Sequence, residues 1–244
     1  MALSLTSAPF NLPNHHLSTR AALAVANINL DAVHVDRGVS PREILSTFDD
    51  RSEGTGFADA LWNDPTNQDL VKAFMTNDFV WYAAQHPDAE VLPHYQAYGL
   101  QDYFYLIDYI GFKALRLNTI PGDDWDSLQR EAKGLAGSVD WVNDWRNTLI
   151  NDLRLTPEEI TQAERSVAEL AYSNVLQRHT SIDDWFDLHV IMIPCVYGWP
   201  KLAKAVYDDP KTLNDTIFYN TWVKPNMDTS SSDKLSGALT TFLP

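Results

Sequence analysis

From Phe57 onward the apolar residues of this chain recur at three- and four-residue intervals, and this spacing strongly limits the folds it can adopt. Segments such as FADALW and NQDLVKAFM place their apolar side chains on one side of a helix with 3.6 residues per turn. No convincing alternation of apolar and polar residues, as is typical of a strand, is found. The pattern therefore predicts an all-α fold.

Three long helices are expected on this basis. The first follows Pro93 and extends to Pro121. The second, WDSLQREAKGLAGSVDWVNDWRNTLINDL, has a weak point at residues 134–137 because glycine destabilises a helix interior. The third, TPEEITQAERSVAELAYSNVLQRHT, begins at Thr156, where a threonine followed by proline and two glutamates is a capping signature.

Two regions are expected along the 244 residues. Residues 1–55 contain Pro9, Pro13, Gly38 and Pro41 and predict an N-terminal extension, with short helices through STRAALAVANI and SPREILSTF. Residues 56–244 predict one helical domain. No run of about 18 apolar residues occurs, so no membrane-spanning helix is expected.

Charge and cysteine content exclude several classes of function. The net charge is −15, whereas a nucleic-acid-binding protein needs a basic surface and an anionic membrane repels an acidic one. We therefore expect a small-molecule partner, with no nucleic acid and no membrane. Cys195 is the only cysteine, so it cannot form an internal disulfide, and a reducing, cytoplasmic location is expected.

A stripe of tyrosines and one carboxylate marks the helix after Pro93. Tyr95, Tyr98, Asp102, Tyr105 and Tyr109 follow each other at spacings of 3, 4, 3 and 4 residues and so share one helix face. They can form an aromatic core in which Asp102 bonds a hydroxyl. They can equally form a wall that sandwiches a flat ligand, with Asp102 holding its polar edge. The spacing leaves both interpretations open.

Cys195 lies in the apolar segment HVIMIPCVYGWPKL. Pro194 should kink or break the helix that contains it, and Pro225 should end the helix through LNDTIFYNTWVK. A cysteine between apolar neighbours is either an inert core residue or a nucleophile whose base lies elsewhere in the sequence. No HExxH pair, phosphate-binding glycine loop or GxSxG motif occurs, and no metal site and no cofactor are expected.

Four short motifs resemble those of the TenA/thiaminase II proteins, relatives of PqqC with the haem-oxygenase-like helical fold. QDYFYL (101–106) is similar to the family's Q-D-x-x-Y-L signature, and IPCVYGW (193–199) to its L-P-C motif. AYSNVL (171–176) resembles its Y-[ST] helix, and YNTWV (219–223) a later Y-x-x-W-I element. Order and spacing agree over roughly residues 56–224.

The resemblance implies a helical bundle with a central, mostly closed pocket and no cofactor. It implies C–N cleavage of an aminopyrimidine, either releasing ammonia or splitting thiamin. Cys195 would be the nucleophile, and Asp102 would hold the ring nitrogen or amino group. The substrate-binding residues would be Tyr98, Tyr105, Tyr172 and Trp199. Such relatives commonly form dimers or tetramers, so a homo-oligomer is expected.

The chain also departs from the family pattern. The family has a catalytic glutamate beyond the W-I element, whereas the sequence after Pro225 contains no glutamate. Trp199 stands where the family commonly has tyrosine, and the tyrosine expected near Asn226 is absent. His94, His189 or a carboxylate of residues 1–55 could supply the missing proton donor.

Three functions remain open from the sequence. The first is hydrolysis of an aminopyrimidine or related heterocycle with Cys195 as nucleophile. The second is a cofactor-free enzyme of specialised metabolism that cyclises, isomerises or adds to its substrate through Asp102 and the tyrosines. The third is a small-molecule-binding protein without catalysis, in which the thiol would be unreactive.

Overall fold

The computed structural model describes residues 56–181, 183 and 185–227. Its α-helices are α3 (Phe57–Asn63), α4 (Gln68–Met75), α5 (Asp78–Gln85), α6 (Asp88–Arg116), α7 (Trp125–Asn151), α8 (Pro157–Gln162), α9 (Val167–His179), α10 (Trp185–Val190), α11 (Ile193–Val196), α12 (Gly198–Asp208) and α13 (Lys224–Asn226). A π-helical turn, Tyr219–Val223, precedes α13. These ranges contain no strand, so the predicted all-α class is confirmed. The helices predicted within residues 1–55 lie outside the described part.

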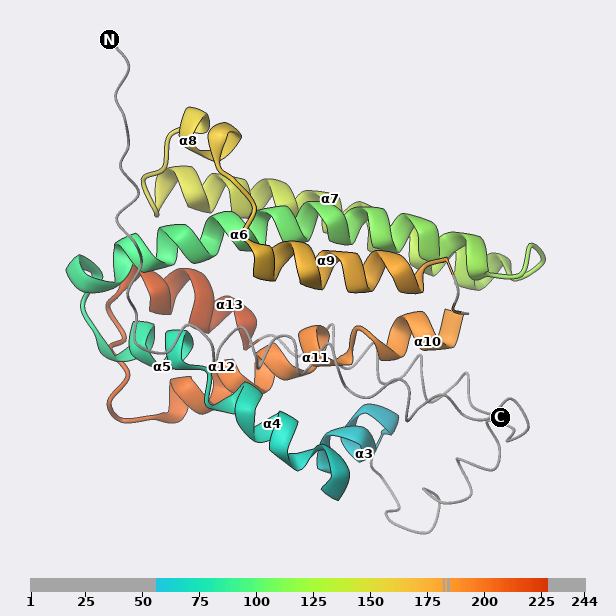
Figure 1. Cartoon of the computed structure of the whole chain (residues 1–244), viewed down its shortest axis with the longest axis horizontal. Helices are drawn as coiled ribbons and strands as arrows, with labels where there is room; N and C mark the ends of the chain where they lie inside the picture. Colours follow the sequence, from blue (N-terminus) through green and yellow to red (C-terminus); the bar gives the residue numbers. More distant parts are fainter. Residues whose placement is uncertain (1–55, 182, 184, 228–244) are drawn as a thin grey trace.

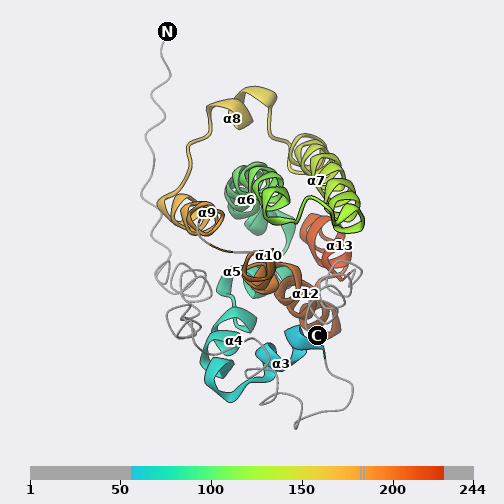
Figure 2. The same ribbon diagram turned by 90° about the vertical axis from the view of Figure 1, so that its right-hand side faces the viewer.

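Helix α6 is the central element of the fold. It packs between α7 and α9, and the chain from α10 to α12 runs along its other side (Figures 1 and 2). Helices α3 and α4 lie beyond α12, which α4 contacts directly, whereas α5 contacts α6. The face of α6 that carries the tyrosines is thus set against the segment that carries Cys195, as their contact described below shows. None of the described helices is long and apolar enough to cross a membrane.

The predicted start and end of α6 are wrong by several residues. The helix begins at Asp88, and Pro93 lies inside it. Proline is tolerated there because its missing N–H removes a single hydrogen bond close to the helix start. The Asp88 carboxylate also accepts the backbone N–H of Ile217 at 2.9 Å, which fixes this end. The helix then ends at Arg116, before a short 3₁₀ turn (Leu117–Thr119).

Helices α6 and α7 approach each other closely at Gly99. A Cβ at this position would lie 2.7 Å from Leu149 Cδ2, so only glycine fits without a shift. The Trp145 indole donates to the Gly99 carbonyl oxygen at 3.1 Å, which satisfies a buried acceptor of α6. In contrast, the weak point expected at residues 134–137 is not a break, because α7 is continuous and its glycines face open space.

The single helix expected from Thr156 is two helices. Thr156 forms the predicted capping box with Glu159, which confirms that start. Helix α8 ends after one and a half turns, and Ser166 caps a new helix, α9, by accepting the N–H of Glu169. Gln101 of α6 holds the break, since it accepts the Ser166 N–H at 2.7 Å and donates to the Glu164 carbonyl at 3.0 Å.

The Cys195 segment is broken into three short helices, as its prolines predict. Pro194 lies in the first turn of α11, where its missing N–H costs no helical bond. The same tolerance explains an error at Pro225. That residue is in the first turn of α13 and does not end the preceding helical turn.

Candidate active site

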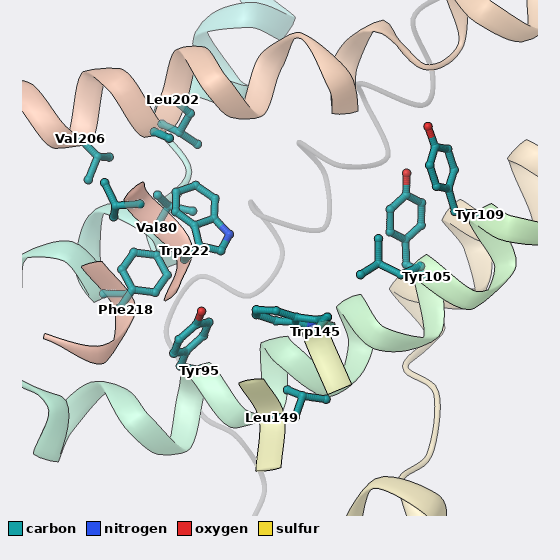
Figure 3. Packing of buried hydrophobic residues seen from close by; sticks show 14 of the residues in the cluster. Val80, Tyr95, Tyr105, Tyr109, Trp145, Leu149, Leu202, Val206, Phe218 and Trp222 are labelled. Atoms are coloured by element: carbon teal, nitrogen blue, oxygen red, sulfur yellow. The ribbon is translucent and has the colours of Figure 1, made fainter. Parts of the chain in front are cut away.

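The tyrosine stripe of α6 is buried along most of its length. Tyr95 lies at the end near the chain's later helices, where its hydroxyl is 2.9 Å from Thr221 Oγ1. Tyr105 and Tyr109 lie further along, with stacked rings 5.8 Å apart. Figure 3 shows their hydroxyl groups pointing to the same side of the helix. The stripe therefore presents phenols, and not only ring faces, to the opposing segment.

Tyr105 joins this stripe to Cys195. Its hydroxyl donates to Cys195 Sγ at 3.2 Å. Burial raises the pKa of the Cys195 thiol to about 11, and the hydrogen bond from Tyr105 opposes that rise. The thiol is consequently protonated at neutral pH in the structure as it stands. It needs a neighbouring base, or a cation brought by a ligand, to become a thiolate.

Asp102 is the carboxylate of the same helix face. Burial raises its pKa from 3.8 to about 7, and no neighbouring cation offsets this effect. In the described part of the chain no side chain or backbone group forms a hydrogen bond with its carboxylate. Its negative charge raises the pKa values of Tyr98 and Cys195, which places both groups in its electrostatic field. A buried acid with a pKa near 7 can both accept and donate a proton.

The remaining predicted residues surround these two. The Tyr98 hydroxyl accepts the indole N–H of Trp222 at 3.3 Å, and its ring stacks on Phe79 at 5.0 Å. The ring of Trp199 lies edge-on to Trp222 at 5.6 Å. Tyr172 of α9 approaches the Tyr105 ring at 5.2 Å. All six predicted site residues thus lie within one linked set of contacts and electrostatic interactions.

The two histidines considered as proton donors lie elsewhere. His189 Nε2 is 3.1 Å from Glu131 Oε1, and Glu131 also pairs with Arg116. His94 lies against the edge of the Tyr82 ring, 6.0 Å between centroids. The carboxylates of residues 1–55 lie outside the described residues.

Lys113 is a charged neighbour that the sequence analysis missed. Its ammonium lies 4.9 Å from the centre of the Tyr109 ring and lowers the pKa of Cys195. Burial lowers its own pKa from 10.5 to about 8. The signal was present, because Lys113 follows Tyr109 by four residues and so lies on the same side of the helix. Among the described residues, no group of three or more His, Cys, Asp and Glu side chains could hold a metal ion.

Comparisons with known proteins identify relatives of this chain. An aminopyrimidine aminohydrolase of Halalkalibacterium halodurans is 25% identical over 130 residues, which are 53% of this chain and 57% of that protein. The chain thus matches little more than half the length of this curated relative.

A crystal structure of a TenA family transcription regulator from Silicibacter sp. TM1040 superposes with a TM-score of 0.56. It covers 77% of this chain and 79% of its own, at 19% identity, and it supports the fold. The model of the TENA/THI-4/PQQC family matches residues 91–235, which include α6, α9 and the Cys195 segment. The chain therefore belongs to the TENA/THI-4/PQQC family.

Proposed function

We propose that this protein hydrolyses a C–N bond of an aminopyrimidine or a closely related heterocycle, with Asp102 as the ligand anchor and Cys195 as the nucleophile. One observation carries the proposal: Asp102 is a deeply placed carboxylate with accessible oxygens and no hydrogen bond to any described residue. A buried carboxylate is costly unless something pairs with it. A ring N–H or amino group of a ligand would pair with it.

Several of the site residues are partly accessible although they lie deep in the helical bundle, and this supports an enclosed binding space. The groups that retain part of their accessible surface are Tyr98, Asp102, Tyr172, Cys195 and Trp199. For the four titratable groups among them, desolvation is nevertheless the largest cause of the raised pKa. A side chain at the outer surface would be hydrated and would show no such effect. Their accessible surface is thus best explained by a hollow inside the bundle, lined by aromatic rings that suit a flat heterocycle.

The chemistry follows from the two pKa values. Asp102, with a pKa of about 7, takes the proton of the Cys195 thiol or shares one with the bound ring nitrogen. The thiolate forms a C–S bond to an electron-poor ring carbon, and ammonia, which takes the proton held by Asp102, leaves as the C–N bond breaks at the exocyclic methylene carbon. Water then adds to that carbon, the C–S bond breaks, and the thiol regains its proton. Tyr105 remains within 3.2 Å of the sulfur and stabilises the thiolate.

The relative's name supports this choice of substrate. The protein of Halalkalibacterium halodurans is named for the hydrolysis of an aminopyrimidine, and it shares 25% identity with this chain over 130 residues. Asp102 is the described group near Cys195 whose pKa of about 7 suits a proton carrier, and the printed residues after Pro225 contain no glutamate.

A second candidate is acid–base catalysis by Asp102 and the tyrosines on another heterocycle, without a covalent intermediate. The observation in its favour is the pKa of Cys195, which burial raises to about 11 while that of Asp102 is raised only to about 7. Under this mechanism the thiol serves as packing and as a weak hydrogen-bond acceptor from Tyr105.

The test is turnover of 4-amino-5-aminomethyl-2-methylpyrimidine and of thiamin by three proteins: the unchanged chain, Cys195→Ser and Asp102→Asn. Covalent hydrolysis predicts that each variant loses at least about 100-fold in kcat/KM, because both act in the bond-making step. The second candidate predicts that Cys195→Ser keeps most activity on its own substrate while Asp102→Asn loses it. Turnover that both variants retain, or no turnover of either compound by the unchanged chain, would reject the proposed hydrolysis.

A further inference from the structure

The Lys113 ammonium has no carboxylate partner among the described residues. Its Nζ donates to Ser138 Oγ at 2.7 Å and to the Gly134 carbonyl at 3.4 Å, and both acceptors are neutral. The neighbouring Arg116 is different, because it pairs with Glu131. Arg165 is likewise bound to Asp108. Lys113 is therefore a half-buried cation that forms no salt bridge with a described side chain, and the charge of Glu131 acts on it only from further away.

Lys113 shares the helix face of Asp102. It follows Asp102 by eleven residues. Because each residue turns an α-helix by about 100°, eleven residues make three turns and return to within about 20° of the same side, roughly 16 Å further along the axis. Tyr105 and Tyr109 come between Asp102 and Lys113 in the sequence, and Figure 3 shows the two tyrosines next to each other on α6. The face thus has a carboxylate at one end and an ammonium at the other.

The charges of Asp102 and Lys113 both affect the pKa of the Cys195 thiol. Asp102 raises the pKa of its thiol and Lys113 lowers it, so both charged groups act on the same sulfur atom. Lys113 is affected in return by Cys195, and also by Arg116 and Glu131. The Tyr109 hydroxyl beside Lys113 forms no hydrogen bond with a described residue, so it is free to bind a ligand atom there.

We propose that Lys113 binds an anionic arm of the substrate, and that the substrate class is an amino-heterocycle that carries a carboxylate or phosphate group on a side arm of the ring. This inference rests on the proposed function for the position of the heterocycle. The ligand's amino end pairs with Asp102, its acidic end with Lys113 and the Tyr109 hydroxyl, and the reacting carbon then lies next to Cys195. A ligand with both charges gives Asp102 a hydrogen-bond partner and gives Lys113 a counter-charge in direct contact.

Three probes test this inference through binding, measured by calorimetry in a Cys195→Ser background that prevents turnover. All three contain 4-amino-2-methylpyrimidine, and they carry at C5 a hydroxymethyl group, its phosphate monoester, or a carboxypropyl group. We expect at least one acidic probe to bind about tenfold or more tightly than the neutral one, as one buried charge pair provides. The better acidic probe distinguishes a phosphate arm from a carboxylate arm.

Variants assign the effect to one residue. Lys113→Met should weaken binding of the preferred acidic probe by about tenfold and leave the neutral probe within about twofold. Lys113→Arg keeps the charge and should keep the preference. Lys133→Met is the matched control, because Lys133 is an exposed lysine of α7 and its loss changes the net charge equally. Circular dichroism of each variant checks that α6 and α7 remain folded.

The possible failures are distinct. If the neutral probe binds in an Asp102-dependent manner but neither acidic arm improves binding, the inference about Lys113 is wrong and the proposed function is unaffected. The same holds if Lys113→Met weakens all three probes equally. If the acidic probes bind through Lys113 but binding is indifferent to Asp102→Asn, the anion site stands and the anchor assigned to Asp102 is wrong. If none of the three probes binds, the inference fails along with the assumed heterocycle.

Discussion

Two buried carboxyl groups of this protein, Glu131 and Asp102, lie in opposite electrostatic settings. Burial opposes ionisation of Glu131, but the hydrogen bond from His189 and the charge of Arg116 lower its pKa from 4.5 to about 2. Asp102 experiences burial alone, and its pKa rises from 3.8 to about 7. The first group joins α6, α7 and α10. The second joins no described elements.

The difference separates groups that hold the fold from groups available to a ligand. Where the chain needs a charge for structure, it supplies the partners, as it does for Arg165 with Asp108 and Glu169. Asp102 has no hydrogen-bond partner among the described residues, and Lys113 forms no salt bridge with any of them. A buried charged group without a charged partner lowers the stability of the fold, and proteins keep such groups mostly at functional sites. The paired groups Arg116, Glu131 and His189 hold α6, α7 and α10 together. Asp102 and Lys113 lie instead on the face of α6 that carries the tyrosines.

The largest expected effect is on stability and comes from Glu131→Gln. The variant keeps the shape of the side chain but leaves Arg116 buried without its counter-charge, which should lower the free energy of unfolding by about 3 kcal/mol. Asp102→Asn is the matched variant at the unpaired site and should not lower it at all. Urea unfolding of both variants near neutral pH measures the contrast. An equal loss from both would show that Asp102 has a structural partner.

The sequence predicted the fold class and the α6 stripe because both depend on local periodicity. The positions of Tyr98, Asp102, Tyr105 and Tyr109 on one face follow from helix geometry alone. The resemblance added that Tyr172 and Trp199 belong to the same site, and the structure places Tyr172 5.2 Å from Tyr105. The spacing could not show whether the face meets a ligand or a core.

Several features were beyond the sequence because they depend on contacts distant in the chain. The break between α8 and α9 is held by Gln101, some sixty residues earlier, and no local signal marks it. The pairing of His189 with Glu131 likewise depends on how α7 and α10 meet. Lys113 was missed for a simpler reason. The alternating spacing of the stripe leads from Tyr109 to Phe112, and Lys113 is the next residue along the chain.

The next effect is a pH dependence of stability, and its sign differs between the two carboxyl groups. Asp102 has a higher pKa in the folded protein than in the unfolded chain, so the folded state binds the extra proton and stability falls as pH rises from about 4 to 7. Glu131 has a lower pKa when folded, so its contribution is complete above about 4.5 and is lost toward pH 2.

Asp102→Asn should therefore remove part of the loss of stability between pH 5 and pH 7, on the order of 1 kcal/mol after allowance for the accessible side of the carboxylate. Glu131→Gln should not alter the change in stability between pH 5 and pH 7. The change in unfolding free energy between pH 5 and pH 7 is measured for each variant. The difference between variants then excludes the contribution of the histidines, because they titrate in all of them. An unchanged difference in Asp102→Asn would mean that its pKa is not raised.

The smallest expected effect concerns the reactivity of Cys195 and separates its two polar neighbours. The Tyr105 hydroxyl lowers the pKa of the thiol through its hydrogen bond, whereas Asp102 raises it through its charge. Tyr105→Phe should therefore slow alkylation by iodoacetamide near pH 8 by about fivefold, as the loss of one hydrogen bond implies, and Asp102→Asn should accelerate it.

Tyr95→Phe is the control, because that hydroxyl contacts Thr221 and not the sulfur, and it should leave the rate unchanged. Rates that change in the same direction in Tyr105→Phe and Asp102→Asn would mean that access to the thiol, and not its ionisation, controls the reaction. Opposite changes would establish that the carboxylate and the phenol act on the same sulfur atom, as the proposed chemistry requires.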